Sequence, residues 1–105
     1  FTLDGFTSSG NTTHAIELRS VYAGSELDGV TFNNINISDS TRGLFIAAYS
    51  GGIVRNINIT NSNITNQSAE AFVFNTNGTG GIENVTLDNL YTQIAFNGLT
   101  LQTGG

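Results

Sequence analysis

The chain has 105 residues, 38% of them hydrophobic, and a formal net charge of −5 at neutral pH. This size suits one small domain with a thin core, and the acidic balance argues against nucleic acid or an anionic membrane as a partner. There is no cysteine to form a disulfide or a thiolate metal site, and no apolar run is long enough to enter a membrane. We expect no cofactor, no metal and no membrane insertion.

The first expected strand, at residues 1–5, has apolar Phe1 and Leu3 on either side of Thr2. This alternation is typical of a strand that buries one face. The same pattern returns three times at intervals of 27 to 29 residues, at positions 30–34, 57–61 and 85–89. A fixed interval of this kind predicts a repeat architecture in which equivalent strands stack on one another.

A second strand follows each first strand, and the spacing between them, measured as from Leu3 to Ile16, stays at 12 or 13 residues. Each second strand begins with a small residue, and the four copies lie at 15–18, 43–46, 71–74 and 98–101. Short segments between the two strands would form a third face, at 36–38, 63–65 and 91–92. A two-sheet sandwich is the competing all-β arrangement, but equivalent strands about 28 residues apart favour parallel stacking.

We predict a right-handed parallel β-helix, a solenoid of about four coils with about 28 residues per coil. It would be a single domain, 1–105, with coils at about 1–26, 27–52, 53–81 and 82–105. The sequence shows no polar or amphipathic capping segment at either end. An uncapped coil can pair its strand edge and its apolar cross-section with another chain. Either the chain is an excerpt from a longer β-helix, or copies stack head to tail.

The fifth position of the first strand predicts a left-handed corner in every coil. Glycine and asparagine adopt positive φ most easily, and stacked asparagine amides can hydrogen-bond along the axis. The expected corner ladder therefore consists of Gly5, Asn34, Asn61 and Asn89.

Seven N-x-S/T sequons make glycosylation a candidate modification, at Asn11, Asn36, Asn58, Asn63, Asn66, Asn77 and Asn84. The alternative is that strand and turn composition produces these triplets without any glycan. Asn66 in a loop and Asn77 in a glycine-rich turn are expected to be the most accessible. An outward polar ladder of Thr2, Thr31, Asn58 and Thr86 could also bind sugar or ice, although such faces are ordinary in β-helices.

His14 is the only histidine, and its surroundings, Thr13-His14-Ala15-Ile16-Glu17-Leu18-Arg19-Ser20-Val21, resemble the polygalacturonase-like glycoside hydrolases. The motif of that family is Gly-His-Gly followed by an Ile-x-Ile strand and a Gly-Ser. Residues 43–46 and 51–57 resemble its later coils. The resemblance covers most of the chain and implies the pectin-lyase-like β-helix fold, whose coil signature many proteins of that superfamily share.

The catalytic residues of that family do not carry over. His14 matches the motif histidine, but Thr13 and Ala15 replace its glycines, and the basic residues that would grip an anionic sugar fall on Phe45 and Ala47. Glycoside hydrolysis needs two carboxylates at most about 10 Å apart. The equivalent pair Asp4 and Asp88 lies three coils apart, about 14 Å at the spacing of stacked strands. Asp28 and Glu83 are also equivalent, with Arg55 in the intervening coil, and these solvated charges would pair across coils as a surface ladder of modest energy.

These observations favour a non-catalytic structural unit of an extracellular or cell-surface assembly, glycosylated and stacked head to tail on copies of itself. The rival is a segment of a polysaccharide-degrading, polygalacturonase-like enzyme in which His14 lines a cleft that other coils complete. A third reading is a carbohydrate-binding adhesin surface, with glycans as partners.

Overall fold

The computed structural model describes residues 1–10, 13–93 and 97–104, and every regular element in them is a strand. The strands are β1 (Thr2–Asp4), β2 (Thr7–Ser9), β3 (His14–Ser20), β4 (Glu26–Asn33), β5 (Asn36–Ser38), β6 (Arg42–Tyr49), β7 (Ile53–Thr65), β8 (Glu70–Asn77), β9 (Gly81–Gln93) and β10 (Asn97–Gly104). No helix in this part of the chain could cross a membrane.

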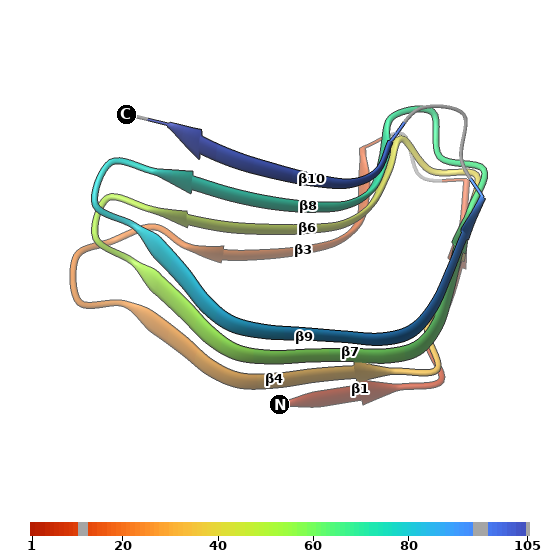
Figure 1. Cartoon of the computed structure of the whole chain (residues 1–105), viewed down its shortest axis with the longest axis horizontal. Coiled ribbons are helices and arrows are strands. Elements are labelled where there is room, and N and C mark those ends of the chain that lie inside the picture. The colour runs from red at the N-terminus through yellow and green to blue at the C-terminus, as the bar shows by residue number, and fades with distance from the viewer. Residues whose placement is uncertain (11–12, 94–96, 105) are drawn as a thin grey trace.

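The strands form two parallel sheets that face each other across the molecule (Figure 1). One has the order β1-β4-β7-β5-β2, with β9 paired to β7, and the other has the order β10-β8-β6-β3. Leu3, Phe32, Ile59 and Leu87 share a column, so successive members are 29, 27 and 28 residues apart. The predicted all-β parallel β-helix is confirmed, as a solenoid of about three turns, and the sandwich arrangement is wrong.

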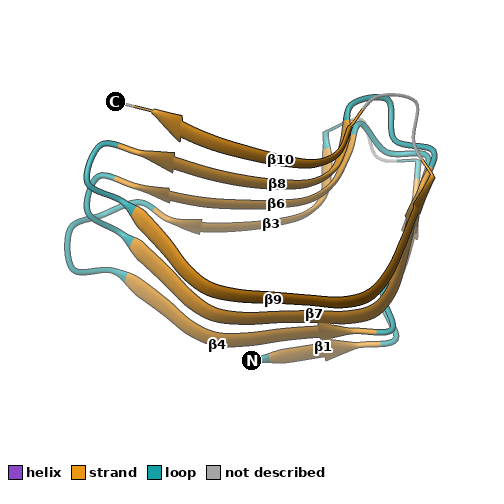
Figure 2. Cartoon of the chain, viewed as in Figure 1, coloured by secondary structure: helices purple, strands orange, loops and turns teal. Residues whose placement is uncertain are grey.

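The third face is formed by β2, β5 and the C-terminal parts of β7 and β9. In Figure 2, β7 and β9 bend away from the direction of their first halves. In the last two coils the first and third faces belong to one continuous strand of 13 residues. The sequence predicted separate strands there. A single residue at positive φ, 50° at Asn61 and 53° at Asn89, turns the backbone while the residues on either side keep their register.

The small residue at the start of each second strand has a steric cause. The pairing of β3 with β6 joins His14 to Arg42 and Ile16 to Leu44. The residue between them is Ala15 in β3 and Gly43 in β6. This position faces the core, where Ala15 and its equivalent Ala71 pack. A side chain at Gly43 would come closer than 3.0 Å to the Ala71 carbonyl oxygen and to Ile64. Position 43 therefore requires glycine, whereas the next coil accommodates a buried alanine, Ala71, at the equivalent position.

The main core lies between the two sheets and is built from the inward positions that the alternation predicted. Ile57, Ile59, Phe72 and Phe74 are at most 6% exposed. Because each coil supplies a few large apolar side chains and rests on its neighbours, the core is a narrow column along the solenoid axis.

Val73 lies on the outer face of the second sheet. Strand alternation points its side chain outward, where exposure would be expected. It is 2% exposed and packs in a second apolar cluster with Phe45, Ala47 and Tyr49. Phe45 is its partner in the column, and side chains from neighbouring positions on the same face exclude water from both.

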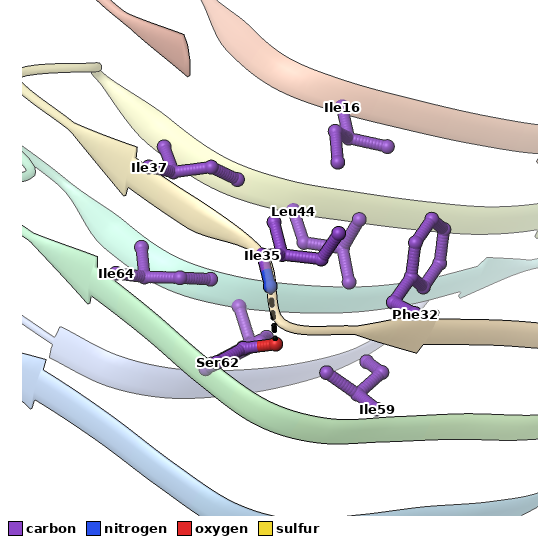
Figure 3. A pocket seen from close by; sticks show the side chains of 9 residues that line it. Ile16, Phe32, Ile35, Ile37, Leu44, Ile59, Ser62 and Ile64 are labelled. Atoms are coloured by element: carbon purple, nitrogen blue, oxygen red, sulfur yellow. Dashed lines mark hydrogen bonds between the residues drawn. The ribbon is translucent and has the colours of Figure 1, made fainter. Parts of the chain in front are cut away.

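The centre of the core holds a small void of about 10 Å³, lined by eight apolar side chains and Ser62 (Figure 3). The Ser62 hydroxyl accepts a hydrogen bond from the Ile35 amide at 3.1 Å and donates one to the Thr60 carbonyl at 2.8 Å. A void of this size with one satisfied polar group does not hold water. It is a packing gap and offers no ligand site.

Candidate functional site

His14 lies on the outer face of β3, at the edge of the β10-β8-β6-β3 sheet. Its ring stacks on Phe45 of β6, with the two centroids 4.3 Å apart and the planes 14° from parallel. The Arg19 guanidinium lies 5.9 Å from the centroid of the same Phe45 ring. The imidazole and the guanidinium thus both lie against Phe45, which belongs to the outer apolar cluster with Ala47 and Val73.

The two carboxylates whose charges act on His14 are both engaged by arginine. Glu17 pairs with Arg19 on the same strand, and Glu70 of β8 accepts a hydrogen bond from Arg42 Nε at 2.9 Å. This is a pattern of ion pairs across and along a sheet face, each of modest energy where it is exposed. Glycoside hydrolysis uses two carboxylates that flank the scissile bond, and both carboxylates near His14 are held in ion pairs.

Burial lowers the pKa of His14 below its ordinary value of 6.5, and the charges of Arg42 and Arg19 act in the same direction, against Glu17 and Glu70. Nδ1 is buried and has no hydrogen-bond partner. A neutral imidazole stacked on Phe45 fits both observations, because a neutral ring is less costly to remove from water than a charged one.

This depressed pKa predicts a pH-dependent stability. The unfolded chain binds a proton at His14 as the pH falls through 6.5, whereas the folded chain does so only at lower pH. The stabilisation is therefore complete above pH 6.5 and is lost progressively as the pH falls below that value and through the lower pKa of the folded state. We expect His14→Gln to flatten the dependence of the free energy of unfolding on pH between 7.5 and 5.5, measured by urea denaturation. Identical slopes for the two proteins would contradict this assignment.

The corner positions all have positive φ, with values of 77° at Gly5, 56° at Asn34, 50° at Asn61 and 53° at Asn89. The side-chain ladder beside them takes a different route from the one predicted. Asn89 donates to Asn61 at 2.7 Å and Asn61 donates to Asn33 at 2.9 Å, so Asn33 takes the place assigned to Asn34. Asn33 in turn donates to Asp4 at 3.1 Å.

Two further ladders of the same kind stand at other corners. Asn84 donates to Asn56 at 2.5 Å, and Asn56 donates to Asp28 at 2.6 Å. Asn66 donates to Asp39 at 3.1 Å. Each amide donates toward the N-terminal coil, and each ladder begins there on an aspartate, which only accepts.

The acidic columns behave as structural charges. Arg55 lies between Glu26 and Glu83, with nitrogen to oxygen distances of 3.2 and 3.1 Å. Asp28, which the sequence placed in this ion-pair column, accepts from Asn56 instead. Asp4 and Asp88 lie in one column with Asn33 and Thr60 between them. Within the described residues no group of three or more potential His, Cys, Asp or Glu ligands gathers around a common point.

The sequons differ in how their amide nitrogens are used. Asn63, Asn66 and Asn84 each donate that nitrogen to a neighbouring coil. Asn58 and Asn77 are exposed and make no such bond within the described part of the chain, while Asn36 accepts from Asn63. Asn11 lies outside the described residues.

The outward polar ladder of Thr2, Thr31, Asn58 and Thr86 lies in register along β1, β4, β7 and β9. Sequence reasoning missed another polar feature, a depression on the third face lined by Thr7, Asn36, Ile37, Ser38, Asn63 and Thr65. The equivalence of Asn36 and Asn63 was visible in the sequence. The depression was not, because it depends on how the third face curves.

Comparisons with protein-family models, with curated proteins and with solved structures find no significant match to this chain.

Proposed function

We propose that this chain is a non-catalytic structural unit of an extracellular assembly, a segment of pectin-lyase-like β-helix whose copies stack head to tail. The observation that carries the proposal is the exposure of inward positions in the outermost coils. Leu87 is 37% exposed, whereas Ile59, the next member of its column, is 1% exposed. Phe1 is 74% exposed in the coil at the other end.

The two end coils are complementary in their apolar residues. If a copy continues the solenoid with the same register, Phe1 meets Val85, Leu3 meets Leu87 and Phe6 meets Leu90. Parallel strand edges supply unpaired N–H and C=O groups for the same contact. A head-to-tail interface of this kind does not close on itself, so it generates a filament.

The same register sets one obstacle, because Asp4 of one copy then stacks on Asp88 of the next. Two carboxylates one strand spacing apart repel each other, and salt screens that repulsion. Stacking is therefore expected to strengthen with ionic strength, unlike an association held by opposite charges.

Electron microscopy and sedimentation velocity of the purified chain test the proposal. We expect rods with an axial repeat of about 19 Å, because each column holds four strands at the strand spacing, and we expect more rods in high salt. Leu87→Lys places a charge in the apolar contact and should leave monomers. Asn58→Lys, on the outer face of the neighbouring coil, is the matched control and should still form rods. A wild-type chain that stays monomeric in both low and high salt would refute the stacking.

The assembly is also proposed to carry N-linked glycans. Asn58 and Asn77 suit this best. A glycan on Asn63, Asn66 or Asn84 would be attached to a side-chain nitrogen that already donates a hydrogen bond to the preceding coil. Peptide mass mapping of the chain secreted from eukaryotic cells identifies the occupied asparagines, and occupancy confined to Asn63, Asn66 and Asn84 would contradict the assignment.

A further inference from the structure

The third face of the solenoid carries a shallow depression of about 90 Å³ between β2, β5 and the C-terminal part of β7, which we call the third-face groove. Ile37 contributes to the floor of this depression, and its side chain is 2% exposed because it packs in the core below. The remaining lining side chains are hydroxyls and carboxamides, from Thr7, Asn36, Ser38, Asn63 and Thr65. None of these six residues is charged.

The polar groups are arranged in two columns that run along the solenoid axis. Thr7, Asn36 and Asn63 form one column, and Ser38 and Thr65 form the other, which Ser9 continues outside the depression. Successive rungs are separated by the spacing of paired strands, about 4.8 Å. The depression therefore offers the same set of groups repeatedly along one direction, which suits a ligand that is itself a chain of similar units.

The side-chain amides of Asn36 and Asn63 in the first column hold each other in place and can still form further hydrogen bonds. Asn63 Nδ2 donates to Asn36 Oδ1 at 3.1 Å. This bond orients both carboxamides, and it leaves further donor capacity on the Asn36 nitrogen and acceptor capacity on the Asn63 oxygen. A sugar hydroxyl both donates and accepts, so it can bond to such a pair and to the threonine and serine hydroxyls beside it.

Tyr91 extends the first column by one rung, since it is the register partner of Asn63 on β9. Its side chain is 55% exposed, and its hydroxyl lies 3.5 Å from Gln93 Oε1. An exposed aromatic ring with a polar tip beside hydrogen-bonding side chains provides an apolar surface for the C–H face of a pyranose.

We propose that this third-face groove binds a neutral polysaccharide, with Asn36 and Asn63 bonding to its hydroxyls and Tyr91 contacting a ring face. The uncharged lining gives no partner to a carboxylate or phosphate, and the net charge of −5 repels polyanions. The groove lies on a different face from His14 and from the Thr2, Thr31, Asn58 and Thr86 ladder. Its use does not depend on whether copies stack.

Affinity gel electrophoresis tests the proposal with the chain made in bacteria, which leaves Asn36 and Asn63 without glycans. The probes are galactomannan, xyloglucan and mixed-linkage β-glucan, with polygalacturonate as the anionic comparison. We expect at least one neutral gel to retard the wild-type chain and polygalacturonate not to. Asn63→Lys should weaken that retardation about fivefold or more, the loss expected from one hydrogen-bonding pair.

Asn58→Lys is the matched control, because it adds the same charge to an exposed asparagine of the same strand, on a different face. It should leave retardation unchanged. Tyr91→Ala should weaken retardation as well. If circular dichroism shows that Asn63→Lys has lost its sheet structure, the result for Tyr91→Ala decides the test. Loss of retardation in Asn58→Lys alone would place the site on the Thr and Asn ladder and overturn the proposal, as would a wild-type chain that no neutral gel retards.

Discussion

Replacing Ile59 by alanine is expected to lower the free energy of unfolding by about 2 to 5 kcal/mol, the range for truncating a buried aliphatic side chain to alanine. Ile59 is 1% exposed and lies in a column between Phe32 and Leu87. A narrow solenoid core has no second layer that could collapse into the space. The neighbouring coils would therefore keep most of the cavity, which places the cost well above that of a surface change.

Two further alanine variants make the measurement specific when all are compared by urea denaturation. Asn58→Ala, exposed next to Ile59, should stay within about 0.5 kcal/mol of the wild type. Val73→Ala should cost roughly 1.5 kcal/mol, two buried carbons at the usual transfer free energy, because its outward-pointing side chain is covered by the second cluster. Equal losses for Ile59→Ala and Asn58→Ala would mean that the inward phase is wrong.

Gly80→Ala is expected to destabilise the fold by about 1 to 3 kcal/mol or more, as forced overpacking does. A Cβ atom at Gly80 would come closer than 3.0 Å to the backbone carbonyl of Ala48, one coil below. A backbone group held in a paired strand cannot turn aside as the end of a side chain can. The turn could accept the methyl group only by moving two coils apart, which weakens the adjacent pairing of β6 with β8.

Gly81→Ala provides the comparison, because a Cβ atom there would meet nothing within 4 Å. We expect its thermal midpoint to equal or slightly exceed that of the wild type, since alanine restricts the unfolded chain more than glycine. A Gly80→Ala protein that melts together with Gly81→Ala would show that these turns do not approach as closely as described.

Much of the fold could be predicted because its determinants are short patterns repeated along the chain. The alternation around Ile57 and Ile59 depends only on the two-residue period of a strand. The corners at Asn61 and Asn89 depend on the tolerance of asparagine for positive φ. Repetition about every 28 residues then specified which strands pair, since like positions stack on like.

Side-chain partners were less predictable, because several polar groups lie within reach at each corner. Asn61 bonds to Asn33, where the repeat suggested Asn34, and Arg55 pairs with Glu26, where it suggested Asp28. Gln67 is 1% exposed, and neither polar atom of its amide has a hydrogen-bond partner. No pattern in the sequence marks this burial.

The sequence by itself determined the parallel β-helix, its interval and its inward positions, because these follow from local alternation and from periodicity. Only the tertiary structure decided that Val73 is covered, that His14 stacks on Phe45 and that Asn36 and Asn63 line a groove with Thr7 and Thr65. These features depend on lateral neighbours across coils and on the curvature of each face. Both are set by how the strands twist and stack, and no short segment of sequence encodes them.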